Sequence, residues 1–289
     1  MRHRLEVLAA ALLFSTGGAG IKLTTLPGWQ VAGFRSAVAA AVLLILLPES
    51  RDLSRGRTWL AAIAYAATVV LFALANKLTT SASAIFLQAS APLWLMLLAP
   101  VLLGERARPR DVIVGAAMVA GMALAFLDRT GGSALAPNPT LGNVLAATTG
   151  LTWALTVVAL RSRSRDDRES PLPVVTAGNI LAFAASIPFM GPLHAPAGRD
   201  VATILYLGAI QVGLGYFFMA RGVRHVPAVE ASLLVLLEPA MNPVWAWLAT
   251  GERPGALAAA GGLVILAATL VQALLRDRPR SAADTATPD

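Results

Sequence analysis

Apolar residues fill ten segments of the chain, and short stretches rich in charged residues, Gly and Pro separate them. Each segment has about 18–24 residues, which at about 1.5 Å per residue lets a helix cross the roughly 30 Å hydrocarbon core of a bilayer. The segments are residues 5–26, 30–48, 58–76, 80–103, 109–127, 140–160, 172–191, 201–220, 227–250 and 254–275. The pattern predicts an all-α polytopic membrane protein with ten transmembrane helices.

The composition supports this prediction, because 56% of the 289 residues are hydrophobic and only 13% are charged. Soluble domains carry roughly 25% charged residues. The first segment follows the basic start "MRHR", which is typical of a secretory signal peptide. Its apolar stretch exceeds the usual core of about 7–15 residues and ends without an A-x-A cleavage pattern, so we interpret it as a span.

Basic residues mark one side of the predicted membrane protein. Of the 23 Lys and Arg residues, 17 fall on the side of the N-terminus, four fall on the other side, and Lys22 and Arg35 lie within spans. This bias predicts that both termini are cytoplasmic, in the inner membrane. The spread of charge over many loops also argues against a nucleic-acid partner. Lys22 and Arg35, near outer span ends, are predicted to extend toward the lipid headgroups.

The chain contains an internal repeat. With a shift of 147 positions, "SAIFLQASAPLWLMLLAPVLLGERARP" from Ser83 aligns without a gap on "EASLLVLLEPAMNPVWAWLATGERPGA" from Glu230. A unit of five spans crosses the membrane an odd number of times, so the second copy must be inverted relative to the first. We therefore predict two inverted five-helix repeats, in residues 1–130 and 131–275, followed by a disordered cytoplasmic tail in residues 276–289.

These repeated blocks, together with "FSTGGAGIKL" and "GWQVAGFRSA" near the start, resemble the drug/metabolite transporter superfamily in its EamA-type exporter branch. The resemblance extends to about residue 275. It implies ten spans in two inverted repeats and a central substrate cavity among spans one, three, four, six, eight and nine. The nearest functional type is the exporter of aromatic and neutral amino acids.

Polar and aromatic residues recur at helical spacing within the spans that this resemblance places around the cavity. The candidate substrate-binding residues are Tyr65, Phe72, Gln88, Trp94, Trp153, Gln211, Tyr216, Glu238, Asn242 and Trp245. Close helix packing is the alternative role for such side chains. Pro92 and Pro239 occupy equivalent mid-span positions, where a missing backbone donor predicts helix breaks. A simple packing kink is the alternative there.

Glu238 is the one charged residue in the largely apolar run from Leu233 to Leu248. A charge at the centre of a spanning helix costs roughly 3 kcal/mol, so Glu238 is predicted to face a cavity or a partner. The equivalent position in the first repeat is Ala91, which favours a functional role over a folding role. No Lys or Arg is expected at mid-depth, and burial without a cation favours the neutral acid. Glu238 is therefore predicted to bind a substrate amine or to exchange a proton, which implies proton coupling.

The sequence offers little support for an enzyme. Cysteine is absent, and the three histidines lie far apart in sequence. We expect no cofactor and no metal site. The leading hypothesis is a secondary transporter that exports small metabolites, most readily amino acids, by alternating access, with a small-molecule substrate and the lipid bilayer as partners. The alternative is efflux of hydrophobic cationic drugs, with Glu238 as counter-ion; a membrane enzyme or channel fits less well. Ile265, in the apolar tenth span, is expected to face lipid.

Overall fold

The computed structural model describes residues 1–102, 109–128, 134–163, 170–193 and 196–276, and every regular element in these ranges is a helix. Nine helical segments of the described chain are long and apolar enough to span a membrane, and Val112–Leu127 forms a shorter apolar helix. These ten segments coincide with the ten predicted from the apolar pattern. The predicted tail lies outside the described residues from residue 277 onward.

Several spans consist of more than one helix. The first five comprise α1 (Arg2–Ser15) with α2 (Gly17–Leu23), α3 (Gly28–Leu46), α4 (Gly56–Leu78), α5 (Ser81–Gln88) with α6 (Ala91–Leu102), and α7 (Pro109–Leu127). The second five comprise α8 (Pro139–Arg163), α9 (Leu172–Ser186), α10 (Gly198–Leu205) with the π-helix η3 (Tyr206–Leu214) and α11 (Gly215–Val223), α12 (Ala228–Val235) with α13 (Leu237–Thr250), and α14 (Ala256–Arg276). Two short 3-10 helices, η1 (Pro48–Arg51) and η2 (Ile187–Phe189), lie in the connections.

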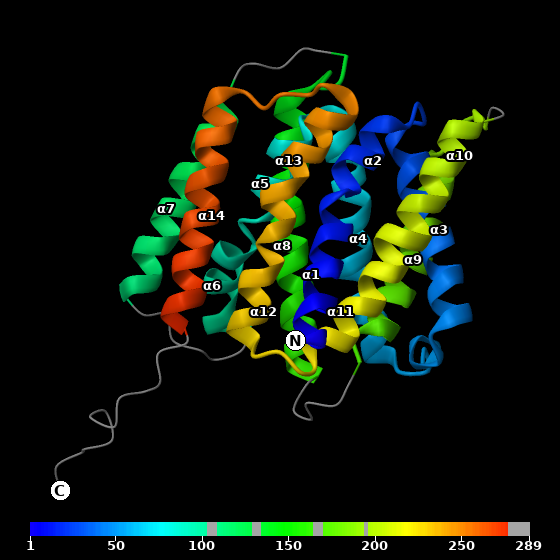
Figure 1. The fold of residues 1–289 in the computed structure, drawn as a ribbon, viewed down its shortest axis with the longest axis horizontal. Coiled ribbons are helices and arrows are strands. Elements are labelled where there is room, and N and C mark those ends of the chain that lie inside the picture. The colour runs from blue at the N-terminus through cyan, green and yellow to red at the C-terminus, as the bar shows by residue number, and fades with distance from the viewer. Residues whose placement is uncertain (103–108, 129–133, 164–169, 194–195, 277–289) are drawn as a thin grey trace, which may run out of the picture.

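Contacts between the two sets of five spans come in pairs: when each span is exchanged for its counterpart in the other set, one observed contact becomes another. α4 packs against α8 as α11 packs against α1, and α5 packs against α8 as α13 packs against α2. α4 also contacts α9 in the way that η3 contacts α3, while α7 and α14 pack against each other at one edge. In Figure 1, α5 and α6 run downward whereas α12 and α13 run upward, and the N-terminus lies at the same end as the last turn of α14. Halves related by a two-fold axis give this pattern.

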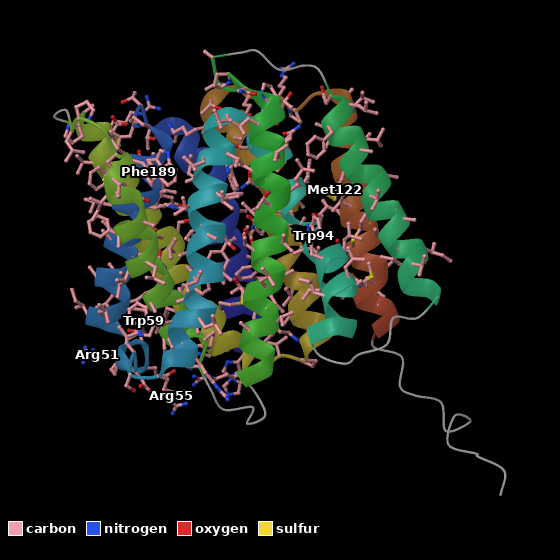
Figure 2. All side chains as sticks on the ribbon, turned by 180° about the vertical axis from the view of Figure 1, so that it is seen from behind. Arg51, Arg55, Trp59, Trp94, Met122 and Phe189 are labelled. Atoms are coloured by element: carbon pink, nitrogen blue, oxygen red, sulfur yellow. The ribbon has the colours of Figure 1, made fainter. Side chains whose placement is uncertain are left out.

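The outer surface of the bundle is apolar. Large hydrophobic side chains that a soluble protein would bury are exposed, including Leu60, Ile63, Val112, Ile113 and Leu263. Such a surface suits the hydrocarbon of a bilayer, where helices satisfy their own backbone groups. At the end of the bundle that holds the N-terminus, Figure 2 shows Arg51 and Arg55, while Phe189 lies near the other end.

Small residues bring α7 and α14 into close contact. A Cβ atom built on Gly261 would lie 2.3 Å from the Gly121 backbone oxygen, and one built on Gly121 would lie 2.7 Å from the Gly261 oxygen. Ile265, one turn further along α14, is fully buried against this contact. The expectation that Ile265 faces lipid is therefore wrong. The apolar composition of α14 does not reveal which side of the helix packs against α7.

Candidate functional site

Four spans depart from regular α-helix near the middle of the bundle. The departures are the breaks between α1 and α2, between α5 and α6, and between α12 and α13, and the π-helix η3. Pro92 and Pro239 lie in the first turn of α6 and α13, where the missing proline N–H needs no helical acceptor. The break at Thr16 and the π-helix contain no proline, and irregular backbone at this depth is characteristic of binding sites.

Three side-chain amides converge on the break between α1 and α2. A Cβ atom on Gly18 would lie 2.6 Å from Asn242 Oδ1 and 3.1 Å from Asn76 Oδ1, and one on Gly17 would lie 3.1 Å from Gln211 Nε2. The three amides therefore reach two adjacent glycines from α4, η3 and α13. Only glycine allows this approach, because any larger side chain would occupy the space that the amides fill.

These amides are buried and only partly hydrogen-bonded. Asn76 and Asn242 have no exposed surface and Gln211 has 7%. Among the described residues, Asn76 Oδ1, Gln211 Oε1 and both amide atoms of Asn242 have no hydrogen-bond partner. Buried polar atoms are normally paired, so this cluster can accept a polar ligand or water. Asn76 is a site residue that the sequence-based list lacks, although its spacing of four from Phe72 on α4 puts it on the same helix face.

A layer of aromatic rings from α1, α4, α8 and α11 lies between the amides and the end of the bundle that holds the N-terminus. The ring centroids of Tyr65 and Tyr216 are 5.9 Å apart, and those of Phe14 and Tyr216 are 4.9 Å apart. Trp153 packs against the same buried cluster. Asn179 Nδ2 donates to the Tyr65 hydroxyl over 3.4 Å. The structure thus brings three of the predicted residues together from three spans, and adds Phe14.

Glu238 is the second residue of α13, next to the break with α12. Its carboxylate has no ion pair and no hydrogen bond to any described residue. Glu238 is partly exposed, and its helix α13 packs against α1, the helix that carries Phe14 of the aromatic layer. Asn242 and Trp245 follow on the same face of α13, and Trp245 Nε1 donates to Ser15 Oγ over 2.9 Å.

Arg35 on α3 adds a cation to this layer. Its side chain is buried, with 3% exposure, and Nη2 donates to the Val69 backbone oxygen over 2.8 Å. Its Nε has no partner among the described residues. The expectations that Arg35 extends to the headgroups and that no cation lies at mid-depth are both wrong, because α4 covers the side chain. Position along a span does not reveal which neighbour covers it.

Lys22, at the end of α2, is also buried instead of reaching the lipid headgroups. Its ammonium donates to the Thr79 oxygen over 2.7 Å and to the Leu135 oxygen, and lies 3.7 Å from Glu252 Oε1. Glu252 Oε1 also accepts from the Ser81 backbone N–H over 2.8 Å. Burial raises the pKa of the Glu252 carboxyl, and the Lys22 ammonium opposes this shift. This ion pair joins the turn after α13 to α2 and α5.

Three predicted residues lie in other parts of the bundle. Phe72 packs against the apolar clusters that contain Ile21 and Leu87. Gln88 is the last residue of α5, and its Oε1 has no hydrogen-bond partner among the described residues. Trp94 lies on α6, which packs against α7 and α8, and its Nε1 also has no described partner. The structure does not bring these three residues to the aromatic layer.

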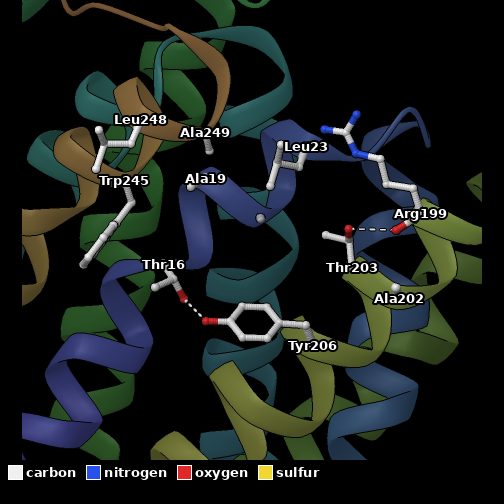
Figure 3. A pocket seen from close by; sticks show the side chains of 11 residues that line it. Thr16, Ala19, Leu23, Arg199, Ala202, Thr203, Tyr206, Trp245, Leu248 and Ala249 are labelled. Carbon is white, nitrogen blue, oxygen red and sulfur yellow. Dashed lines mark hydrogen bonds between the residues drawn. The ribbon is translucent and has the colours of Figure 1, made fainter.

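A cleft of about 530 Å³ opens at the end of the bundle opposite the N-terminus, between α2, α10, η3 and α13 (Figure 3). Its lining residues are Thr16, Ala19, Gly20, Leu23, Arg199, Ala202, Thr203, Tyr206, Trp245, Leu248 and Ala249. Thr16 Oγ1 and the Tyr206 hydroxyl share a hydrogen bond of 2.9 Å. Trp245 is the only predicted site residue in this lining. Because Thr16 directly precedes Gly17, the deep end of the cleft adjoins the amide cluster.

Ion pairs join the helices at the opposite end, where the N-terminus lies. Glu6 of α1 lies 3.6 Å from Arg221 of α11 and 3.0 Å from His3. Arg4 pairs with Glu230 of α12 over 3.1 Å. The structure is therefore open at one end of the bundle and held together by charged groups at the other. Within the described parts of the chain, no three His, Asp or Glu side chains gather in a way that could hold a metal ion.

Comparison with known proteins gives one consistent family. The sequence profile of the EamA-like transporter family matches residues 5–127 and 140–273, one match for each set of five spans. The chain is 28% identical to the aromatic amino acid exporter YddG of Ancylobacter novellus over 64% of each chain. It is 27% identical to the pseudopaline exporter CntI of Pseudomonas aeruginosa over 92% of this chain and 94% of the relative.

A probable terminal-alkyne amino-acid exporter of Streptantibioticus cattleyicolor is 26% identical over 88% of this chain and 84% of that protein. A solved crystal structure that is 24% identical superposes with a TM-score of 0.64 and covers 96% of this chain and 99% of its own. That likeness concerns the fold alone. Since the family profile covers both halves, the chain is a multi-pass membrane protein that belongs to the EamA-like transporter family, which is not an enzyme family.

Proposed function

We propose that this protein is a secondary transporter that exports small metabolites of the amino-acid class, with neutral and aromatic amino acids as the preferred substrates. The observation that carries the proposal is the position of Glu238. Its carboxylate has no described ion partner and lies beside a break in its own span, on a helix that packs against α1. A membrane-buried carboxylate in such surroundings is a functional site by default, because a structural charge would be paired.

The relatives support an amino-acid-like substrate. Three similar exporters are named for an aromatic amino acid, for pseudopaline and for a terminal-alkyne amino acid. The rings of Tyr65, Tyr216 and Trp153 supply the apolar and aromatic surface that a neutral or aromatic side chain needs. The amides of Gln211 and Asn242 supply hydrogen bonds without a fixed charge.

We propose that the two halves, residues 1–130 and 131–275, are inverted relative to each other and that both termini are cytoplasmic in the inner membrane. The opposite directions of α5–α6 and α12–α13 support the inversion. The excess of Lys and Arg at the end that holds the N-terminus supports the orientation. In this cysteine-free chain, a cysteine at Pro27 should react with an impermeant maleimide on intact cells, and one at Ser54 only after permeabilisation. The reverse labelling would overturn the orientation.

In this orientation the cleft faces the outside and the ion pairs of α1 lie on the cytoplasmic side. Transport by alternating access then requires the Glu6–Arg221 and Arg4–Glu230 pairs to separate so that substrate can enter from the cytoplasm. In both pairs the arginine side chain is about half exposed or more, so water can replace the contact and the pairs can separate at little cost. The amide cluster and the aromatic layer lie between the two ends, at the point where each end would have access in turn.

Transport by purified protein in liposomes tests the proposal. Wild-type protein should move radiolabelled phenylalanine, and Glu238→Gln should lose transport or its pH dependence between about pH 6 and about pH 8, because it cannot take up or release a proton. Glu49→Gln, which removes an exposed carboxylate of η1 that pairs with the exposed Arg224, is the matched control and should behave as wild type. Equal rates and equal pH profiles for Glu238→Gln and wild type would reduce Glu238 to a packing residue.

Efflux of hydrophobic cations is the competing function, because an unpaired carboxylate among aromatic rings also suits a cation. The buried guanidinium of Arg35, which donates to the oxygen of Val69 beside the same tyrosine pair, disfavours it. A protein that moves lipophilic cations but no amino acid in the same liposomes would support the competing function.

A further inference from the structure

The cleft between α2, α10, η3 and α13 lies on the side of α2 that faces away from the amide cluster. Gly17 and Gly18 of α2 approach the amides, whereas Ala19, Gly20 and Leu23 line the cleft. With 3.6 residues per turn, these two sets lie on opposite faces of the helix. In Figures 1 and 3, α2 forms the back of the cleft, with α13 on one side and α10 on the other. The cleft is therefore a groove in the lateral surface of the bundle, and α2 lies between it and the amide cluster.

The walls of this groove are mainly apolar. At its deep end the Tyr206 hydroxyl shares a hydrogen bond of 2.9 Å with Thr16, and Trp245 Nε1 donates to Ser15 Oγ over 2.9 Å. The polar atoms of both rings are thus engaged at the end of α1, and the rings add aromatic surface to the groove. Five further lining residues have hydrocarbon side chains: Ala19, Leu23, Ala202, Leu248 and Ala249. Such walls suit a hydrocarbon chain.

Among the described residues that line the groove, Arg199 is the only charged one. Its side chain is exposed, and Figure 3 shows the guanidinium at the outer end of the groove, directed toward Leu23. The next residue fixes this position. Asp200 Oδ1 accepts from the Thr25 backbone N–H over 2.8 Å, and Oδ2 accepts from the Thr25 hydroxyl over 2.6 Å. These bonds hold the first turn of α10 beside the end of α2.

The dimensions of the groove match one leaflet of a bilayer. Arg199 is the second residue of the span Gly198–Val223, so it lies at the depth of the lipid headgroups. From Arg199 to Tyr206 the lining extends over seven residues, or about 10 Å of helix. One leaflet supplies about 15 Å of hydrocarbon, half of the roughly 30 Å core. The groove therefore offers a cation at headgroup depth and apolar walls along most of an acyl chain.

We propose that this groove binds an anionic phospholipid, with the headgroup phosphate on Arg199 and one acyl chain between α10 and α13. The guanidinium fork matches two phosphate oxygens. The apolar walls hold the chain of any lipid, and the lining has no carboxylate for the ammonium group of a zwitterionic headgroup, so the cation favours a net negative one. In the orientation proposed above, the lipid belongs to the outer leaflet. Binding itself requires neither that orientation nor the transport function.

Native mass spectrometry of purified protein in detergent tests the headgroup contact. The probes are dioleoylphosphatidylglycerol and dioleoylphosphatidylcholine, which share their chains and differ in net charge. Wild type should bind the phosphatidylglycerol about fivefold more tightly, the effect of one basic side chain at headgroup depth. Arg199→Gln should remove this preference and leave phosphatidylcholine binding unchanged. Arg253→Gln, which removes another exposed arginine at the same end of the bundle but outside the groove, is the matched control and should keep the preference.

A second pair of variants tests the groove itself. Ala202→Trp fills the groove and should weaken binding of both lipids severalfold. Val201→Trp adds the same ring at an exposed neighbouring position outside the lining and should bind both lipids as wild type does. Inorganic phosphate, which has no chain, should not displace either lipid. Equal affinity of wild type for the two lipids, an equal loss of preference in Arg199→Gln and Arg253→Gln, or unchanged lipid binding by Ala202→Trp would overturn the proposal.

Discussion

The Lys22–Glu252 ion pair provides the sharpest test of the tertiary structure. Lys22→Met removes a buried ammonium that donates to the Thr79 and Leu135 oxygens and lies 3.7 Å from Glu252 Oε1. The side chains of Lys22 and Glu252 are only 2% and 5% exposed, so water cannot readily replace the lost partner. The substitution therefore leaves two carbonyl oxygens and one carboxylate short of a donor, although Ser81 N–H still reaches Glu252.

The expected loss of stability is about 3–5 kcal/mol, the usual result of removing one partner of a buried ion pair. Three acceptors that each lose a donor, at about 1–3 kcal/mol apiece, give a similar figure. Glu252→Gln should lose less, because Lys22 keeps both carbonyl acceptors. The double variant should lose at least about 1.5 kcal/mol less than the sum of the two single variants, because the second change removes a group that the first has already left unpaired.

The same substitution should make stability depend more strongly on pH. Burial already raises the pKa of the Glu252 carboxyl in the folded protein, and removing the opposing Lys22 ammonium raises it further. Between the unfolded pKa of about 4.3 and this raised value, the folded state binds more protons than the unfolded state. Stability of Lys22→Met therefore falls as pH rises through that window. Lys22→Met with Glu252→Gln should lack this dependence.

Unfolding of purified protein by titration with SDS, followed by circular dichroism at about pH 5 and about pH 8, measures these effects. Additivity of the two single variants within about 0.5 kcal/mol would show that the groups do not interact. If, in addition, Lys22→Met lost less than about 1 kcal/mol, the range of an exposed pair, Lys22 would lie at the lipid headgroups. The packing of α2 against α5 and against the turn after α13 would then be refuted.

Two further predictions concern close approaches at glycine. Gly18→Ala would place a Cβ atom 2.6 Å from Asn242 Oδ1. It should reduce phenylalanine transport in liposomes severalfold. The unfolding midpoint should change little, because the side-chain amide of Asn242 can shift. Wild-type rates would show that the amide cluster is not part of the path. Gly261→Ala would place a Cβ atom 2.3 Å from the Gly121 backbone oxygen, which cannot shift alone, so SDS titration should show a loss of about 1–3 kcal/mol. Gly198→Ala, with no atom within 4 Å of the new Cβ, should be neutral in both assays.

The sequence carries most of the architecture because the bilayer imposes a one-dimensional rule. A span must be long and apolar, so the ten helical segments can be located from composition along the chain. The repeat is likewise visible as an alignment of the chain with itself. Proline acts through its own backbone, so the positions of Pro92 and Pro239 indicate irregular backbone without any knowledge of neighbouring helices.

The other two irregular regions have no such local signal. The break at Thr16 and the π-helix η3 become understandable only when Gly17, Gly18 and Gln211 are seen to meet. Helical spacing indicated that Gln211 and Asn242 each lie on a polar face. It could not indicate that the two faces, 31 residues apart in sequence, converge on a third segment near the N-terminus.

Burial of charge is the clearest division between what the sequence determined and what only the tertiary structure decided. The sequence by itself determined that Lys22, Arg35 and Glu238 each lie within an apolar span, because a span is defined by its apolar run. The tertiary structure decided that Lys22 meets Glu252, that Arg35 meets Val69, and that Glu238 meets no cation among the described residues. The physical reason is that the direction of a side chain around its helix, and the neighbour that covers it, depend on packing between helices. Packing between spans is set by small residues and polar contacts that lie far apart in the chain, and hydropathy does not record them.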